Sequence, residues 1–454
     1  MLNRLSYSAT NEDSRQRVDM NEFLDKLSSI ADQPQPAYRI VMMILSECFA
    51  LAKRHIPKGL PARKERIASG SLRQKNNILG MTPIETLPRE NVPRPQWEPG
   101  VEKYYRLPYQ PWTYYAKSIL QLHNESGNVW THFVAFFFFI VLIYKYHLIL
   151  DFNREETWPL LMFGVSCMCA ASGSSMAHLF HSKSTYVHYI AMAFDFAAVS
   201  LYSFASVCIV LYYSSDDELL ISYGNLLMPL NAVLAFAACF GCSHGNTKYS
   251  LHHHLRRKLW YFIPEGSFFV ACLAPAVIRF AKISSWDAAP VAEVESYRLH
   301  LTYFSCFAFG SFFFFSHIPE LLFPGKFDIY CHSHQIWHFF GPVTIYFQFK
   351  TAYVDINNRQ RDPAALAQLP SPSALWLYFV VVVIVNLLCI VYIAHEARKV
   401  VDKERLEIVQ DKNKPAKQNP IDQAEKHADV LGATSPRSRK ITAKSCQSFS
   451  DSCL

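Results

Sequence analysis

Two histidines four residues apart, His334 and His338, are the side chains in this sequence with the plainest capacity for chemistry. On a helix, residues at i and i+4 lie on one face about 5–6 Å apart, so the two imidazoles can bind one divalent ion. The pair lies in the segment 313–340, which leaves one apolar run, passes a link containing Pro324 and Gly325, and enters another run. Because this spacing is common by chance, it indicates a metal site only if a third ligand lies at the same depth.

The composition indicates that these histidines belong to a membrane protein. Of the 454 residues, 51% are hydrophobic and 18% are charged, against about 25% charged in soluble domains. The net charge is +7, from 44 Lys and Arg against 37 Asp and Glu, and the basic residues gather in the two polar ends. We therefore expect an integral membrane protein that binds no nucleic acid. Many of the twelve cysteines lie in apolar runs, which argues against a disulfide framework.

Eight apolar runs predict an all-α transmembrane bundle. They fall at about 129–150, 158–180, 186–213, 219–243, 259–280, 299–317, 333–350 and 374–394. The last is the clearest, because Asn386 is its only strongly polar side chain and Arg398 and Lys399 follow it. An even number of spans places both termini on the same side of the membrane.

The chain outside these runs divides into two polar regions. Residues 1–118 contain no secretory signal, so we expect a cytosolic N-terminal region, disordered in part, with an amphipathic helix at 38–52. Its segment 87–112 is rich in proline and aromatic residues, which predicts an extended chain laid along another part of the protein. The bundle takes residues 119–396, and 397–454 form a charged tail that we expect to be disordered.

Counting the spans identifies a third ligand. The end of the second run and the starts of the third and seventh all face the side of the N-terminus, where His178, Asp195 and the pair His334 and His338 stand. Asp195 is the only charged residue of its run, and a charge at membrane depth is costly enough to indicate function. Three imidazoles with an open position are the ligands of a catalytic zinc site, and a nearby carboxylate can hold a metal-bound water. Ser174, one turn before His178, can face the same site.

Two alternatives stay open at this point. His178 and Asp195 can instead pair with each other or with the backbone, and a bound metal can serve only to staple helices together. In the first run, Glu125, Asn128 and His132 share a helix face and either bond neighbouring helices or line the site.

Three patches, in this order, resemble the signature motifs of the progestin and adipoQ receptor family. They are NESGNVWTH at 124–132, SSMAH at 174–178 followed by Asp195, and PGKFDI with SHQIWH between Pro324 and His338. The likeness covers roughly residues 105–340. The eighth run makes the chain similar to the membrane progestin receptor branch rather than to the adiponectin receptors.

The resemblance implies a seven-helix bundle in the plasma membrane, with a cytosolic N-terminus and here an additional eighth helix. It implies that His178, His334 and His338 bind Zn²⁺, with Asp195 holding a water and Ser174 nearby. The membrane progestin receptors are associated with binding progesterone-like steroids and with signalling to cytosolic effectors, and the adiponectin receptors with ceramide hydrolysis. Two functions therefore stand: a receptor for a steroid or lipid, or a zinc-dependent lipid amide hydrolase.

Two further features carry hypotheses of their own. Cys239, Cys242 and His244, with the run His252–His254, are either a second metal site or part of a basic link at the membrane surface. Glu265 in the fifth run is either a ligand contact or a hydrogen-bonding group beside a proline kink.

Short motifs lie at three other places. Asn124 begins a glycosylation pattern, but its position at the cytosolic mouth argues against modification. In the tail, Ser438 among basic residues is a candidate phosphorylation site, and residues 452–454 are a candidate for recognition of the C-terminal carboxylate.

Overall fold

The computed structural model describes residues 72–73, 85–249 and 254–413, and it divides the chain into two units, Met1–Val401 and Asp402–Leu454. The amphipathic helix predicted at 38–52, Ser438 and the C-terminal residues lie outside the described part.

Among the described residues there are eight long helices, and the last of them, α12, continues past Val401, the last residue of the first unit. In chain order they are α4 (Ser126–Leu150), α5 (Trp158–Phe180), α6 (Thr185–Ile209), α7 (Asp217–Lys248), α8 (His254–Ala281), α9 (Val291–Ser316), α10 (Ser333–Asn358) and α12 (Pro372–Asn413). Shorter elements are α3 (Trp112–Ser118), α11 (Pro363–Leu366) and an antiparallel sheet of β1 (Leu72–Arg73), β2 (Glu85–Leu87) and β3 (Tyr105–Arg106). Six of the eight predicted runs fall within one long helix each, the run 186–213 continues from α6 into a π-helical turn at Val210–Ser214, and the run 299–317 ends one residue after α9. This confirms the all-α bundle with an eighth C-terminal helix.

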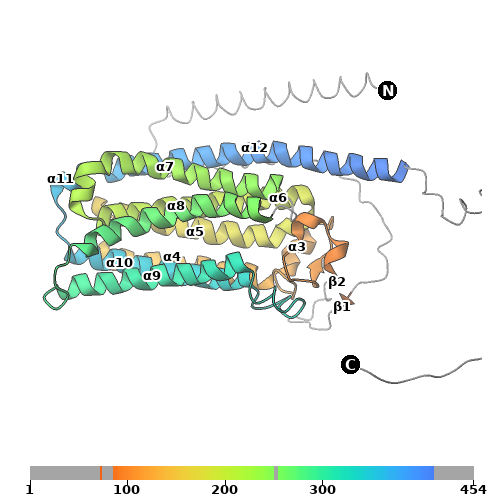
Figure 1. Ribbon diagram of the computed structural model, residues 1–454, viewed down its shortest axis with the longest axis horizontal. Coiled ribbons are helices and arrows are strands. Elements are labelled where there is room, and N and C mark those ends of the chain that lie inside the picture. Colours follow the sequence, from red (N-terminus) through yellow and green to blue (C-terminus); the bar gives the residue numbers. More distant parts are fainter. Residues whose placement is uncertain (1–71, 74–84, 250–253, 414–454) are drawn as a thin grey trace, which may run out of the picture. The chain divides into compact units, whose positions relative to one another are not determined.

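The long helices lie side by side, with α9 and α10 packed together and α5 packed on α6 (Figure 1). Helix α6 is the most enclosed, with 72% of its most apolar stretch buried, against 22% for α8 and α9. Large apolar side chains on α4, such as Val141 and Leu148, are exposed, as expected for a surface that faces lipid. Among the described residues, seven helices are long and apolar enough to cross a membrane, and only α10 of the eight falls short.

Helix α10 is less apolar because its buried face carries polar side chains along its whole length. His338, Thr344, Gln348 and Asp355 are all buried. Asp355 accepts hydrogen bonds from Arg279 of α8 (3.1 Å) and from Ser296 of α9 (2.7 Å). His338, Gln348 and Asp355 have partners inside the bundle, whereas the buried Thr344 hydroxyl has none among the described residues. Because all four side chains face inward, α10 can lie among membrane helices without exposing them to lipid.

The eighth helix packs against the middle of α6. The Asn386 amide of α12 donates to Ser200 Oγ (2.6 Å) and to the Ala197 carbonyl (3.4 Å). Around it, Ile390 and Ile393 of α12 pack with small side chains of α6 in a buried cluster. The one polar residue of this run therefore serves as a contact between helices.

The segment before α3 runs along the end of α5, as its composition predicted. Arg106 of β3 is 1% exposed, and its guanidinium donates to the carbonyls of His178 (2.7 Å) and Leu179 (2.6 Å). It also donates to Ser118 and Ser182 at 2.9 Å. The last carbonyls of a helix have no partner within the helix, so Arg106 caps the C-terminal end of α5.

The structure extends α12 beyond the predicted span. Residues 397–413, which the sequence analysis assigned to a disordered tail, form its last turns. Glu396 pairs with Lys399 (2.8 Å), one turn further along the same face. Pairs of this spacing and the strong helix formers in this stretch favour continuation of the helix.

Candidate metal centre

Three imidazole nitrogens meet where α5 ends and α10 begins. The Nε2 atoms of His178 and His334 are 3.2 Å apart, and those of His334 and His338 are 3.1 Å apart. Nitrogens bound to one tetrahedral zinc ion at about 2.0–2.1 Å lie about 3.3 Å from one another. The three side chains thus form a cluster that could hold one metal ion, with the spacing such a site needs.

The start of α10 is held by the link that precedes it. Ser333 donates its backbone N–H to Glu320 Oε2 (2.7 Å), and its hydroxyl group bonds to Glu320 Oε1. A carboxylate at a helix N-terminus pairs with free N–H groups and with the helix dipole. Glu320 therefore fixes the first turn of α10, which presents His334, and His338 follows one turn later.

The outer nitrogens of two of the rings have partners that orient them. His178 Nδ1 lies 2.8 Å from Glu125 Oε2, and His338 Nδ1 lies 3.2 Å from the Asn128 carbonyl oxygen. Because these oxygens accept, the proton of each ring sits on Nδ1 and the lone pair on Nε2 faces the centre of the cluster. The donor set and its supporting bonds fit a metal ion such as Zn²⁺.

Glu125 places a carboxylate against the histidine cluster. It is 1% exposed and stands just before α4. Burial by itself would raise the pKa of its carboxyl group, but the charge of His181 and hydrogen bonds from His178 and His181 hold that pKa well below its ordinary value. Asn128 also donates to its Oε2 (2.7 Å). The carboxylate is therefore kept charged at the place where it orients His178.

Asp195 and Ser174 lie beside the three histidines. Asp195 Oδ2 is 4.0 Å from His178 Nε2, which is too long for a hydrogen bond. Both side chains are buried, and the Ser174 hydroxyl lies near the Asp195 carboxyl group. Within the described part of the chain, Asp195 Oδ1 has no hydrogen-bond partner. A buried, unpaired carboxylate oxygen next to the cluster is suited to accept a proton from a molecule bound there.

The structure adds His181 and His188, which sequence reasoning did not select, and it places His132, which shares a helix face with Glu125 and Asn128, against the cluster. His181 Nε2 lies 3.5 Å from Glu125 Oε1, and its Nδ1 lies 3.1 Å from Nδ1 of His188. His132 of α4 stacks on His338, with ring centroids 3.9 Å apart. The position of His181 one helical turn after His178 was a signal, but spacing alone does not tell a ligand from a supporting ring.

The second Cys/His group does not assemble among the described residues. Cys239 and Cys242 are buried, whereas His244 stacks on Phe240. The groups of metal-binding side chains found in the described ranges involve neither cysteine. His252 and His253 lie outside the described residues. Asn124 is 2% exposed and buried, consistent with the expectation that it is not glycosylated.

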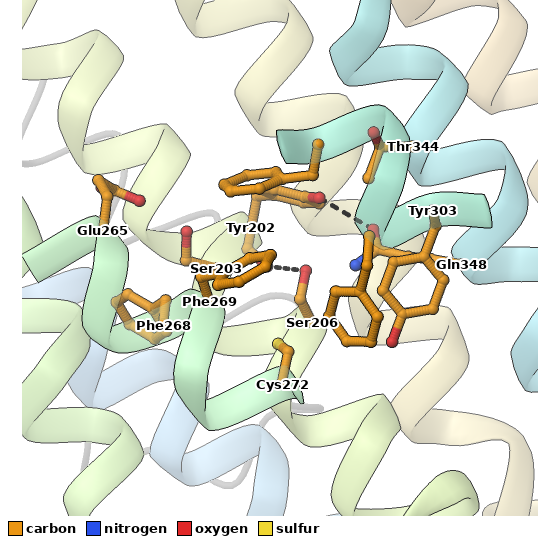
Figure 2. Close-up of a pocket in the computed structure, with 12 residues that line it drawn as sticks. Tyr202, Ser203, Ser206, Glu265, Phe268, Phe269, Cys272, Tyr303, Thr344 and Gln348 are labelled. Atoms are coloured by element: carbon orange, nitrogen blue, oxygen red, sulfur yellow. Dashed lines mark hydrogen bonds between the residues drawn. The ribbon is translucent and has the colours of Figure 1, made fainter. Parts of the chain in front are cut away.

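A pocket lies further into the bundle, between α6, α8, α9 and α10 (Figure 2). The cavity itself has a volume of about 40 Å³, and the space free of protein atoms between its lining side chains reaches about 390 Å³ when the part open to the outside is included. Its wall is mainly aromatic, with polar groups from Ser203, Glu265 and Gln348; the Tyr202 hydroxyl donates to Gln348 Oε1 (2.9 Å). Glu265 Oε1 accepts a weak hydrogen bond from Cys242 Sγ of α7 (4.0 Å). It therefore faces a cavity and also has a partner within the bundle.

A bundle of membrane-length helices around a buried histidine cluster defines an integral membrane protein with a candidate intramembrane metal site. A family model described as haemolysin-III related matches residues 120–349. The chain belongs to this family, which includes the progestin and adipoQ receptors that its motifs resemble.

Named relatives fall in one branch. The chain is 31% identical to membrane progestin receptor beta of Mus musculus over 276 residues, which is 60% of this chain and 77% of the relative. It is 31% identical to membrane progestin receptor alpha of Cynoscion nebulosus over 257 residues, 56% of this chain and 72% of the relative. For membrane progestin receptor gamma-A of Danio rerio, the identity is 29% over 298 residues, 63% and 86% of the two chains.

Proposed function

We propose that this protein is a receptor of the plasma membrane that binds a steroid or lipid within a zinc-containing bundle and signals to a cytosolic effector. Its N-terminus lies in the cytosol in this proposal. The relatives named above are membrane progestin receptors, which favours a steroid of the progestin class as the ligand.

The observation that carries the proposal is that two helices, α6 and α10, contribute side chains to both the pocket and the metal centre. Helix α6 carries Asp195 at the centre and Tyr202 and Ser203 in the pocket. Helix α10 carries His338 at the centre and Gln348 in the pocket. A ligand with fused rings has to push apart the aromatic walls, so its binding shifts α6 against α10. Such a shift is transmitted to the end of the bundle where the histidines lie.

The residues of the metal centre divide into ligands and supports. His178, His334 and His338 would bind Zn²⁺, and Glu125 and the Asn128 carbonyl orient two of their rings. Bound zinc supplies a Lewis acid that polarises a carbonyl group and activates water. Asp195 stands where it can accept a proton, and Ser174 lies beside its carboxyl group.

The unpaired oxygen of Asp195 supports a second candidate function, hydrolysis of an amide-bonded lipid. A receptor that uses the metal only to hold α5 and α10 together has no need of a proton acceptor beside it. A hydrolase needs one within hydrogen-bond reach of the reacting group.

The test uses purified full-length protein, loaded with zinc, in three forms: wild type, His338→Ala and Asp195→Asn. Zinc content, saturable binding of radiolabelled progesterone and release of fatty acid from ceramide are measured on each form. His338→Ala should lose zinc, with affinity lowered at least about 100-fold, because one of three protein ligands is removed. His147→Ala, which removes a histidine at the other end of α4, is the matched control and should keep its zinc.

The two functions predict different outcomes for Asp195→Asn. A receptor keeps its zinc and its progesterone binding, whereas a hydrolase keeps zinc and loses turnover. No saturable progesterone binding by intact, zinc-loaded wild type would contradict the receptor. No release of fatty acid at any pH from about 5 to 9, the range around the titration of water on zinc, would contradict the hydrolase.

A further inference from the structure

Three consecutive apolar side chains are exposed in the link between α9 and α10. Leu321, Leu322 and Phe323 are 54%, 61% and 53% exposed, while Glu320 just before them is 2% exposed. Runs of exposed apolar residues outside the spans of a membrane protein require a covering partner.

The backbone that presents these side chains is held in a fixed turn. The N–H groups of Leu322 and Phe323 both donate to the Pro319 carbonyl, at 3.1 Å each. The Gly325 N–H donates to the carbonyl of Gly100 (3.0 Å). A Cβ atom on Gly100 would lie 2.4 Å from the Glu320 carbonyl oxygen, so only glycine allows this approach. The three residues, here called the Leu321–Phe323 turn, are therefore held outward by their own backbone.

The turn continues the surface that faces lipid. It begins five residues after the end of α9, where Phe312 is 58% exposed. The neighbouring start of α8 is joined to the end of α9 by a hydrogen bond from Lys258 Nζ to the Phe315 carbonyl (2.8 Å). On that part of α8, Leu255 and Phe262 are also exposed.

The groups around the turn are those found at a bilayer surface. Tyr330, later in the same link, is 56% exposed, and Lys326 is exposed beside it. At the start of α8, Arg256 is exposed. Tyrosines are enriched at membrane interfaces, and basic side chains there attract anionic headgroups. Apolar residues flanked by these groups fit the boundary between headgroups and acyl chains better than the surface of a soluble partner.

We propose that the Leu321–Phe323 turn inserts into the interfacial layer of the bilayer and anchors the adjoining end of the protein there. The anchor is joined to the N-terminal segment at one point, where the Glu102 N–H donates to Asp328 Oδ1 of this link (3.0 Å). His334 follows the turn within eleven residues, so the anchor also sets the depth of the metal centre in the membrane. The proposal depends on the membrane fold and not on the identity of the ligand.

The test places a fluorescent amino acid at one position at a time in the full-length protein, reconstituted in vesicles with one in five lipids anionic. Position Leu322 is the test site, exposed Asn91 is the control outside the bilayer, and Val141 on α4 is the control within it. Quenching is measured with lipids brominated near the headgroup, with lipids brominated deep in the acyl chain, and with aqueous iodide. Gel filtration and circular dichroism check that each labelled protein is folded.

The label at Leu322 should be quenched about twofold more than the label at Asn91 by shallow bromines, since interfacial segments lie about 5–10 Å into the boundary. The label at Val141 should respond most to deep bromines. Equal quenching of Leu322 and Asn91 by bromolipids would overturn the proposal. Protection of Leu322 from iodide without quenching by bromolipids would also overturn it, because a protein segment or a second copy would then cover the turn.

Discussion

Each ring nitrogen of His178 faces a different partner. Nε2 points to the other two histidines and Nδ1 points to Glu125, at 2.8 Å. A carboxylate behind a ligating histidine fixes its tautomer and makes it more basic, and loss of such a partner typically costs 10–100-fold in metal affinity.

Glu125→Gln should therefore lower zinc affinity by about 10–100-fold while the protein stays folded. The glutamine keeps the size of the side chain but loses the negative charge that makes the His178 ring a more basic ligand. The measurement is zinc retention against a chelator of graded concentration. Glu102→Gln, a carboxylate in the neighbouring segment whose side chain does not face His178, serves as control. Equal zinc retention by the two variants would show that Glu125 does not support the cluster.

At the scale of residues, the members of the cluster were predictable and their supports were not. His178, Asp195, His334 and His338 could be found because counting spans places them at one depth. Glu125 shares a helix face with Asn128 and His132, and that pattern fits several roles. Which oxygen meets which nitrogen is decided by side-chain packing between α4, α5 and α10, which spacing along one helix does not contain.

Among the elements, the two-residue strand β3 supplies the cap of α5. Its Arg106 caps α5 through two carbonyls and two hydroxyl groups, all in a buried site. The rigid, planar guanidinium can reach all four at once, whereas the single ammonium of lysine cannot.

Arg106→Lys should lower the free energy of unfolding by about 2–4 kcal/mol, because buried carbonyl groups lose their partners. The apparent midpoint of thermal unfolding in detergent reports this loss. Arg89→Lys is the control, since the Arg89 guanidinium only lies over the Trp97 ring, at 5.4 Å, and is half-buried. A shift of the same size in both variants would mean that the cap on α5 is not what stabilises this end.

The sequence predicted the positions of the long helices better than their ends. The predicted span at 299–317 begins eight residues after the observed start of α9 at Val291. Glu293, Glu295 and Arg298 lower the hydropathy of the first turns, yet Glu293 pairs with Arg279 inside the bundle (2.8 Å). A hydropathy profile counts a charged residue as polar even when it is paired inside the bundle. The start of a helix such as α9 is therefore placed too late until the partner of the charged residue is known.

For the molecule as a whole, the stability depends on pH through Glu98, a carboxyl group that lies before the first membrane-spanning helix. The pKa of Glu98 is raised to about 7, mainly because the group is buried and also because the Glu125 carboxylate repels its charged form. Between the ordinary pKa of 4.5 and about 7, the folded protein binds this proton and the unfolded chain does not. The stabilising contribution of Glu98 is therefore present below about pH 4.5 and is lost as the pH rises through about 7.

Replacing this group should remove that dependence. For Glu98→Gln, the difference in unfolding free energy from wild type should change between pH 5 and pH 8 by at most about 3 kcal/mol, with the variant gaining at the higher pH. Thermal unfolding of both proteins at several pH values measures the difference. A difference that stays constant across this range would contradict the raised pKa.

The polar face of α10 also bears on how the protein is made. An aspartate costs about 2.5–3.5 kcal/mol at the centre of a helix that passes from the translocon into lipid alone. Asp355 lies in the last turn of α10, where the cost is smaller but still opposes insertion. The partners that neutralise Asp355, Arg279 of α8 and Ser296 of α9, precede it in the chain and are synthesised first. We infer that α10 enters the bilayer by pairing with α8 and α9 already in place, so that the order of synthesis itself makes its insertion favourable.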